Sequence, residues 1–334
     1  MASNVYSAEP AHPVLAQSLL GEPGPTATDK ERPTRGSTAN DWNLKDDWAT
    51  GIQSSSDGIF RSGTVIGFSR LRTRSSDNDE YIGQIPRYLL TTHLRKCSPS
   101  VEANIFIIYP SNFEGFAARN LFTDLQSGPS PLSKDDALKK LDSVQLFPVY
   151  SMQNAAQAIK QVSELVQEAQ ERRQQLDQTA ASSNSAIILV VAGLDTLAEG
   201  VVRASNPARG AAVLASTLRI LTRMSRTHGS FLSVILVNTN GLGPHVEIEH
   251  EGSNGRAAVG TTEVDAKPTS HDGIYSIFQL PGSSLLSTLL MRTLDQGIDT
   301  HILLSDVKYT RVAEVIKDRT GAGLGKWGIW SPHR

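Results

Sequence analysis

Residues 186–192 read AIILVVA, residues 211–227 read AAVLASTLRILTRMSRT, and residues 231–238 read FLSVILVN. The first and last segments are apolar runs rich in isoleucine and valine, which is typical of strands covered on both faces. The middle segment repeats apolar residues at the spacing of one helix face: Leu214, Leu218, Leu221 and Met224. A buried strand, a helix and a second buried strand in this order join parallel strands. The stretch therefore predicts a parallel sheet covered by helices.

The same alternation continues in both directions along the chain. We expect further strands at residues 63–68, 104–109, 144–149 and 275–280, and further helices at residues 82–94, 116–125, 152–176 and 285–294. An antiparallel pair, 299–305 with 312–318, is expected to turn at residues 307–310, before a last strand at 327–330. The predicted fold class is α/β, a mostly parallel sheet flanked by helices with antiparallel edge strands at the C-terminus.

The first 56 residues differ in composition from the rest. They are rich in Pro, Ser, Thr, Asp and Gly and show no regular apolar spacing, which predicts a disordered N-terminal tail at residues 1–56 and one core domain at residues 57–334. Trp42 and Trp48 interrupt this tail. We interpret them as a strap that packs on the core, with a short docking peptide as the alternative.

Bulk properties exclude several classes of protein. The net charge of −2 over 334 residues means that any DNA contact must come from a local patch. The single cysteine, Cys97, excludes an internal disulfide and indicates a reducing compartment. Neither a targeting leader nor the roughly 20 apolar residues of a membrane span is visible, so we expect a soluble intracellular protein without membrane contact.

The order of segments resembles the RecA-like recombinase family, in particular eukaryotic strand-exchange recombinases and their paralogues. AIILVVAGLDTL is similar to the family's Walker B strand, and LAEGVVRASNPARGAAV to its first DNA-binding loop. LASTLRILTRMSRTHG and SVILVNTNGL are similar to its arginine-bearing helix and to the strand that ends in Thr-Asn-Gln. QLPGSSLLSTLLMRTLDQGIDTHILL is similar to the segment that follows its second DNA loop. The resemblance implies a RecA-like core over about residues 58–330.

The motifs for ATP hydrolysis are missing. A P-loop needs Gly-x-x-x-x-Gly-Lys-Ser/Thr, because backbone amides and the lysine hold the phosphates, but residues 68–79 read FSRLRTRSSDND. The strand that would end in a magnesium-organising Asp ends in Ala192-Gly193, and Asp195 lies further along. The place of the water-activating Glu reads Tyr109-Pro110-Ser111-Asn112, and Gly241 stands in the place of the Gln.

We therefore expect a degenerate nucleotide site and no bound cofactor, retained ATP and magnesium binding being the alternative. The residues of that degenerate site are Arg70, Arg72, Arg74, Ser75 and Asp195.

The resemblance also places DNA contacts. Residues 202–210 stand where the family has a mobile loop that tracks phosphates, so Arg203 and Arg209 are predicted to bind DNA. Arg219 and Arg223 lie, with Arg226, on one face of the following helix. These helix arginines are either further DNA contacts or a solvated face. The acidic composition of residues 242–272 counts against tight DNA binding there.

Two other sets of polar residues attract notice but do not predict chemistry. A loop contains His245, Glu247, Glu249, His250, His271 and Asp272 without strict ligand spacing, so no metal site is expected. The carboxylate pairs Asp195 with Glu199, and Asp295 with Asp299, are interpreted as helix-cap and turn residues.

The resemblance implies a non-catalytic recombinase paralogue that acts in the nucleus, in homologous recombination and DNA repair, through subunit assembly and DNA binding. Its expected partners are other RecA-like recombinase subunits in a hetero-oligomer, and the C-terminal GLGKWGIW is a candidate edge for their packing. Two alternatives stay open. One is a RecA-like ring subunit of an Elongator-type tRNA-modification complex, and the other is a divergent ATPase.

Overall fold

The computed structural model describes residues 47, 50–52, 58–72, 79–96, 105–127, 130–176, 186–243, 274–278, 284–307, 310–319, 321 and 323–330. Trp42, Trp48 and Cys97 lie outside these residues, as does most of the predicted tail. The boundary at residue 56 therefore stays a prediction.

The core is one eight-stranded sheet with the order β3-β2-β4-β5-β1-β6-β7-β8. The strands are β1 (Val65–Leu71), β2 (Ile105–Pro110), β3 (Val144–Val149), β4 (Ile187–Ala192), β5 (Leu232–Leu242), β6 (Thr300–Val307), β7 (Thr310–Asp318) and β8 (Trp327–Trp330). Strands β1 to β6 pair in parallel, whereas β7 is antiparallel to both β6 and β8. The expected fold class is confirmed: an α/β core with a mostly parallel sheet flanked by helices and antiparallel strands at its C-terminal edge.

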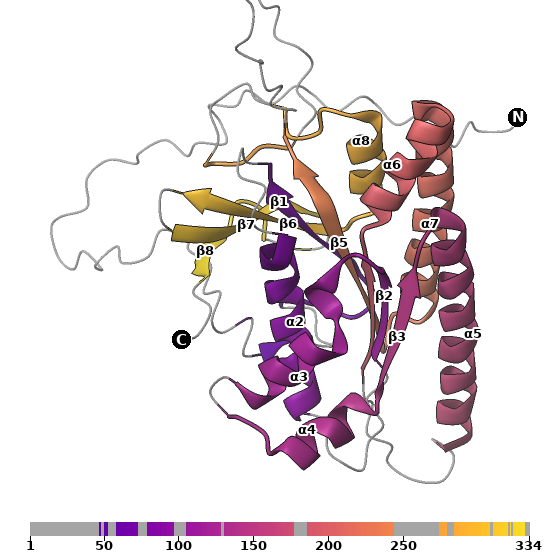
Figure 1. The fold of residues 1–334 in the computed structure, drawn as a ribbon, viewed down its shortest axis with the longest axis vertical. Helices are drawn as coiled ribbons and strands as arrows, with labels where there is room; N and C mark the ends of the chain where they lie inside the picture. Colours follow the sequence, from indigo (N-terminus) through magenta and orange to yellow (C-terminus); the bar gives the residue numbers. More distant parts are fainter. Residues whose placement is uncertain are drawn as a thin grey trace, which may run out of the picture. The chain divides into compact units, whose positions relative to one another are not determined.

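Helices cover both faces of the sheet because the buried strands present apolar side chains alternately to each side (Figure 1). In β4, Ile188 and Val190 pack in one core with residues of α2, α3 and α4, while Leu189 and Val191 pack in another with α5, α6 and α7. The helices are α2 (Asp79–Lys96), α3 (Ala118–Gln126), α4 (Lys134–Leu141), α5 (Met152–Leu176), α6 (Leu194–Ala204), α7 (Pro207–Thr227) and α8 (Leu289–Gln296), with a 3-10 turn, η2 (Glu114–Phe116).

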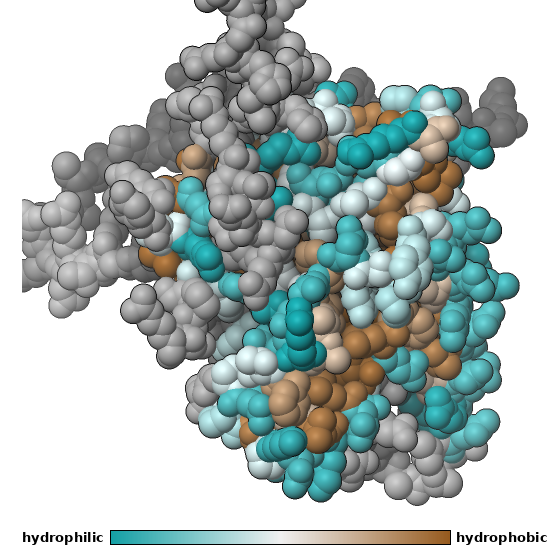
Figure 2. Space-filling view, in the orientation of Figure 1, coloured by the Kyte–Doolittle hydropathy of each residue, from teal (hydrophilic) through white to brown (hydrophobic). Residues whose placement is uncertain are grey.

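The predicted stripe of residues 152–176 is confirmed as helix α5. Its apolar side, including Ile159, Val162 and Val166, is buried against the sheet, and hydrophilic side chains cover its outer face (Figure 2). The same view shows hydrophobic surface over β3, which is one edge strand of the sheet.

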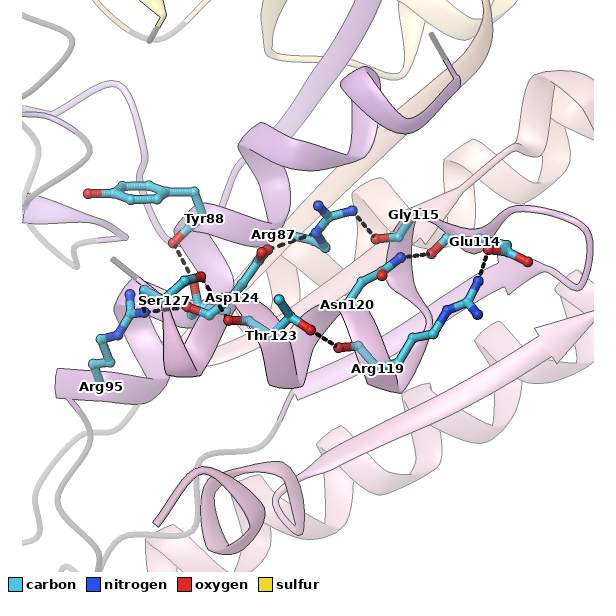
Figure 3. A network of polar contacts seen from close by, with 11 residues as sticks. Arg87, Tyr88, Arg95, Glu114, Gly115, Arg119, Asn120, Thr123, Asp124 and Ser127 are labelled. Atoms are coloured by element: carbon cyan, nitrogen blue, oxygen red, sulfur yellow. Dashed lines mark hydrogen bonds and ion pairs between the residues drawn. The ribbon is translucent and has the colours of Figure 1, made fainter. Parts of the chain in front are cut away.

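A polar network fastens α2 to the segment that follows β2 (Figure 3). The buried guanidinium of Arg87 donates through Nε to Asp124 Oδ2 at 2.8 Å and through Nη1 to the carbonyl oxygen of Gly115 at 2.7 Å. Arg95 donates to the carbonyl oxygen of Ser127 at 2.6 Å. These bonds hold η2 and α3 against α2. Residues 111–113 therefore connect two anchored elements, β2 and η2.

Two predicted elements need correction, and one helix was missed. Residues 274–278 form no strand, because Ser276 Oγ and the Ile277 N–H donate to the carboxylate of Glu314 rather than to a neighbouring strand. Helix α4 was missed, and residues 202–210 are helical over most of their length. No helix among the described residues is both long and apolar enough to cross a membrane.

Candidate functional site at the carboxyl edge of the sheet

Four parallel strands bring the sequence-predicted site together at one edge. The carboxyl ends of β1, β2, β4 and β5 lie side by side, since β1 pairs with β5, and β4 pairs with both β2 and β5. They border a cavity of about 380 Å³, which we call the arginine cavity. Its lining includes Arg70, Arg72, Pro110, Asn112, Thr196, Glu199, Arg203, Thr239 and Asn240. Arg74 and Ser75 lie outside the described residues.

Asp195 is buried, and both oxygens of its carboxylate accept hydrogen bonds from β5. Its Oδ2 accepts from the backbone N–H of Asn240 at 2.6 Å, and its Oδ1 accepts from Thr239 Oγ1 at 3.2 Å. Burial raises the pKa of Asp195, although hydrogen bonds from Asn240 and Thr239 work in the opposite direction. Asp195 therefore fastens α6 to the end of β5. The helix-cap interpretation was wrong, because Gly193 stands at the N-cap of α6 and Asp195 lies within the first turn.

The remaining polar groups of α6 and β5 also bond to one another. Thr196 Oγ1 lies 2.5 Å from Thr239 Oγ1 and donates to Asn240 Oδ1 at 3.1 Å. Asn240 Nδ2 donates to Glu199 Oε2 at 2.9 Å, and Glu199 Oε1 accepts from Arg203 at 2.6 Å. The carboxylates of Asp195 and Glu199 are thus both engaged with protein groups.

Arg72 closes the network from β1. Its Nε and Nη2 donate to the carbonyl oxygen of Asn240 at 3.2 and 3.1 Å. Burial lowers the pKa of Arg72, while the nearby Glu199 and Asp195 raise it. Arg70 reaches the same cavity. These two arginines are brought together with Asp195, as the degenerate site requires, but Arg72 bonds to β5 instead of pointing freely at a ligand.

Two glycines allow the strand ends to meet so closely. Gly241 has φ +74, and a Cβ there would lie 3.1 Å from the carbonyl oxygen of Arg70. Gly193 has φ +66, and a Cβ there would lie 2.5 Å from Pro110 Cγ. Since L side chains rarely adopt such φ values, both positions are restricted to glycine by backbone geometry and by contact.

The predicted mobile DNA loop is helical instead. Helix α6 runs to Ala204, and α7 begins at Pro207, with the side chain of Asn206 accepting from the Arg209 N–H. A Cβ on Gly210 would lie 2.3 Å from Val202 Cγ2, so this glycine serves close packing of α6 on α7. Arg203 and Arg209 are exposed, on the last turn of α6 and the first turn of α7. They are close in the chain and held by rigid elements.

Arg219 and Arg223, further along α7, do not form one patch with Arg203 and Arg209. Arg219 and Arg223 are exposed, but they lie 10 and 14 residues beyond Arg209, which is roughly 15 and 21 Å along a helix. Arg226 has a structural role, since it donates to the carbonyl oxygen of Gly63 at 2.6 Å and to Asp299 Oδ1 at 2.7 Å. Asp299 also accepts from the Val65 N–H at 2.8 Å, which anchors the start of β1.

Sequence reasoning missed a buried polar chain beneath the site. Asn238 Nδ2 donates to Ser69 Oγ at 2.7 Å, Ser69 Oγ lies 2.8 Å from His301 Nε2, and His301 Nδ1 lies 3.0 Å from Asp295 Oδ1. Lys317 Nζ donates to Asp295 Oδ2 at 2.6 Å. The order Ser–His–Asp resembles a hydrolytic triad, yet Ser69 and His301 are fully buried. A substrate has no access to these two side chains, so this series of buried hydrogen bonds has a structural role. Asp295 was interpreted as a turn residue, which was wrong.

No group of metal-ligating side chains occurs in the part of the chain that the structure describes. The loop with His245, Glu247, Glu249, His250, His271 and Asp272 lies outside that part, so the expectation of no metal there stays a prediction.

The chain is similar to proteins whose structures have been solved. A solved structure described as the RadB recombinase matches this chain with a TM-score of 0.47 and 13% sequence identity, over 84% of this chain and 93% of that chain. No protein-family model matches the sequence, and the curated proteins give no match. At this identity and TM-score the similarity carries no information about function, which has to come from the site residues.

Proposed function

We propose that this chain is a non-catalytic RecA-like subunit. In this proposal it assembles with other RecA-like subunits in the nucleus and supports homologous recombination and DNA repair, contacting DNA through Arg203 and Arg209. One observation carries it: at the edge where a nucleotide would be handled, Asp195 and Glu199 bond to β5. Arg203, which also pairs with Glu199, and Arg209 keep exposed side chains near this edge.

The chemistry of this edge supports contact with an anion rather than its hydrolysis. Hydrolysis needs a positioned magnesium ion and a group that orients the attacking water. Asp195 is buried and accepts from the Asn240 N–H. Glu199, the carboxylate that lines the arginine cavity, is held by Asn240 Nδ2 and by Arg203. Exposed guanidinium groups on fixed helices are instead suited to phosphate oxygens.

We expect magnesium-ATP to leave the thermal unfolding midpoint unchanged. A ligand at 100 times its dissociation constant stabilises a folded protein by about 2.7 kcal/mol, so a working site would raise the midpoint by several degrees. Differential scanning fluorimetry with and without magnesium-ATP measures this. A clear rise that Arg70→Ala removes would contradict the proposal and support the divergent ATPase.

Replacing both Arg203 and Arg209 with alanine is expected to weaken binding of single-stranded DNA and to flatten its salt dependence. Each lost phosphate contact reduces the slope of log affinity against log salt by about 0.7, so two contacts reduce it by about 1.4. Fluorescence anisotropy titrations at several salt concentrations measure both quantities.

The matched control is the double variant Arg219→Ala with Arg223→Ala, which removes the same charge further along α7. Its effect is expected to be smaller, and an equal effect would indicate a broad basic face instead of a local contact. Unchanged binding in the Arg203 and Arg209 variant would refute the DNA assignment. A preference for tRNA in the wild-type chain would favour the Elongator-type alternative.

A further inference from the structure

A second cavity lies beside the arginine cavity, at the carboxyl ends of β2 and β3. It has a volume of about 580 Å³ and is bordered by α6 and by the first turn of α7. This volume is within the roughly 300–1,000 Å³ of ligand-binding clefts. Pro110, Asn112 and Thr196 line both cavities, so the two cavities are neighbours. We call this second space the tyrosine cavity.

Tyr150 stands at the wall of the tyrosine cavity with 78% of its surface exposed, the largest value for a large hydrophobic side chain among the described residues. Its backbone is fixed on both sides. The Ser111 N–H donates to the carbonyl oxygen of Val149 at 3.0 Å, and Ser151 Oγ accepts from the Asn154 N–H at 3.2 Å as α5 begins. The aromatic ring therefore projects from a rigid position.

The other groups that line the tyrosine cavity suit a flat ring joined to a phosphate. Val149, Leu197 and Val201 supply apolar surface, and the exposed amide of Asn112 offers both a donor and an acceptor. Arg209 is the charged residue of the described lining, which contains no carboxylate. The tyrosine cavity thus combines an aromatic face, an amide and a guanidinium.

We propose that the tyrosine cavity receives an unpaired base of single-stranded DNA, which stacks on Tyr150 while an adjoining phosphate contacts Arg209. This inference rests on the proposed function and makes it specific for single strands, because a base in a duplex already has both faces stacked. A free nucleotide shares the chemistry. We favour a strand because the neighbouring arginine cavity shares Asn112 and adds the exposed Arg203 as a contact for a second phosphate.

The test compares two ligands with the same phosphates. The full chain is titrated against fluorescein-labelled oligothymidylate and against a strand of equal length whose residues are abasic, with anisotropy as the readout. Aromatic stacking contributes about 1–3 kcal/mol per base, so Tyr150→Ala is expected to weaken oligothymidylate binding roughly 5- to 150-fold. The same variant is expected to bind the abasic strand as the wild type does.

Three variants complete the design. Tyr150→Phe keeps the ring and is expected to retain binding, and Tyr275→Ala removes an exposed tyrosine that does not line the tyrosine cavity and is expected to have no effect. Arg209→Ala is expected to weaken binding of both strands. Because Tyr150 is largely exposed, its loss is not expected to change the thermal unfolding midpoint.

The outcomes separate the inference from the function on which it rests. If Tyr150→Ala weakens both strands equally or neither, the stacking subsite is refuted while the arginine contacts stand. If thymidine monophosphate alone displaces the strand from the wild type, the site is for a free nucleotide and the inference is overturned. If the wild type binds neither strand, the proposed DNA function itself fails.

Discussion

Replacing Asp295 with alanine is expected to lower the free energy of unfolding by about 3 kcal/mol. Removing one partner of a buried ion pair costs about 3–5 kcal/mol, because the other charge stays buried without compensation. The lower end of this energy range applies to Asp295→Ala. The Lys317 side chain is 13% exposed, so water can hydrate its ammonium group once the carboxylate is removed. Denaturant unfolding followed by circular dichroism measures the change.

A matched control is Asp306→Ala. Asp306 lies 3.9 Å from Arg311, and its side chain is 41% exposed, so its loss is expected to cost less than about 1 kcal/mol. A loss in Asp295→Ala as small as in this control would contradict a stabilising role for the buried chain.

Asp295 also makes stability depend on pH. Burial alone raises the pKa of Asp295, but hydrogen bonds and charge from His301 and Lys317 outweigh it and lower that pKa below its ordinary value. The contribution of Asp295 to the free energy of unfolding is therefore present above its pKa in the unfolded chain. It is lost as pH falls through its pKa in the folded chain. In Asp295→Asn, the free energy of unfolding is expected to lose this dependence on pH in the acidic range.

For Asp195 we expect alanine and asparagine to differ in stability. Alanine leaves the Asn240 N–H without its acceptor, which costs about 1–3 kcal/mol. Asparagine keeps an oxygen for that N–H, can donate its amide hydrogen to Thr239 Oγ1, and carries no charge. Asp195→Asn is therefore expected to be at least as stable as the wild type at neutral pH, again measured by denaturant unfolding.

The pH dependence gives the same test a second readout. Because burial raises the pKa of Asp195 in the folded chain, its stabilising contribution is present at low pH and is lost as pH rises through that value. Any advantage of Asp195→Asn is expected to shrink on acidification. If magnesium-ATP stabilises the wild type but not Asp195→Asn, then Asp195 organises magnesium. Its hydrogen bonds to β5 would then not be its main role.

Much of the sheet could be predicted from the sequence because its signals are local. The six residues of β4 are all apolar and all buried, and the stripe of α5 is long enough to be unambiguous. Helix α4 was missed because KDDALKKL has a narrow apolar side, with Ala137 buried but Leu138 47% exposed. Short helices of this kind depend on their cap, which here is Ser133.

The site was harder to predict because it depends on contacts between distant strands. Pro207 and Gly210 were interpreted as loop residues. Asn206 followed by Pro207 is also a helix-start signal, and could have been recognised, but the contact of residue 210 with Val202 is visible only in the structure. The bond from Arg72 to Asn240 likewise requires the pairing of β1 with β5.

The central position of β1 has a consequence for the synthesis of the protein. β1 ends at Leu71, but its neighbours β5 and β6 begin at Leu232 and Thr300. At about 5–20 residues per second, a ribosome needs on the order of 10–30 seconds to make the chain between β1 and β5. During that time the apolar strand VIGFSRL has no partner on either edge, so the nascent chain carries an unpaired strand that has to be kept from pairing with other molecules.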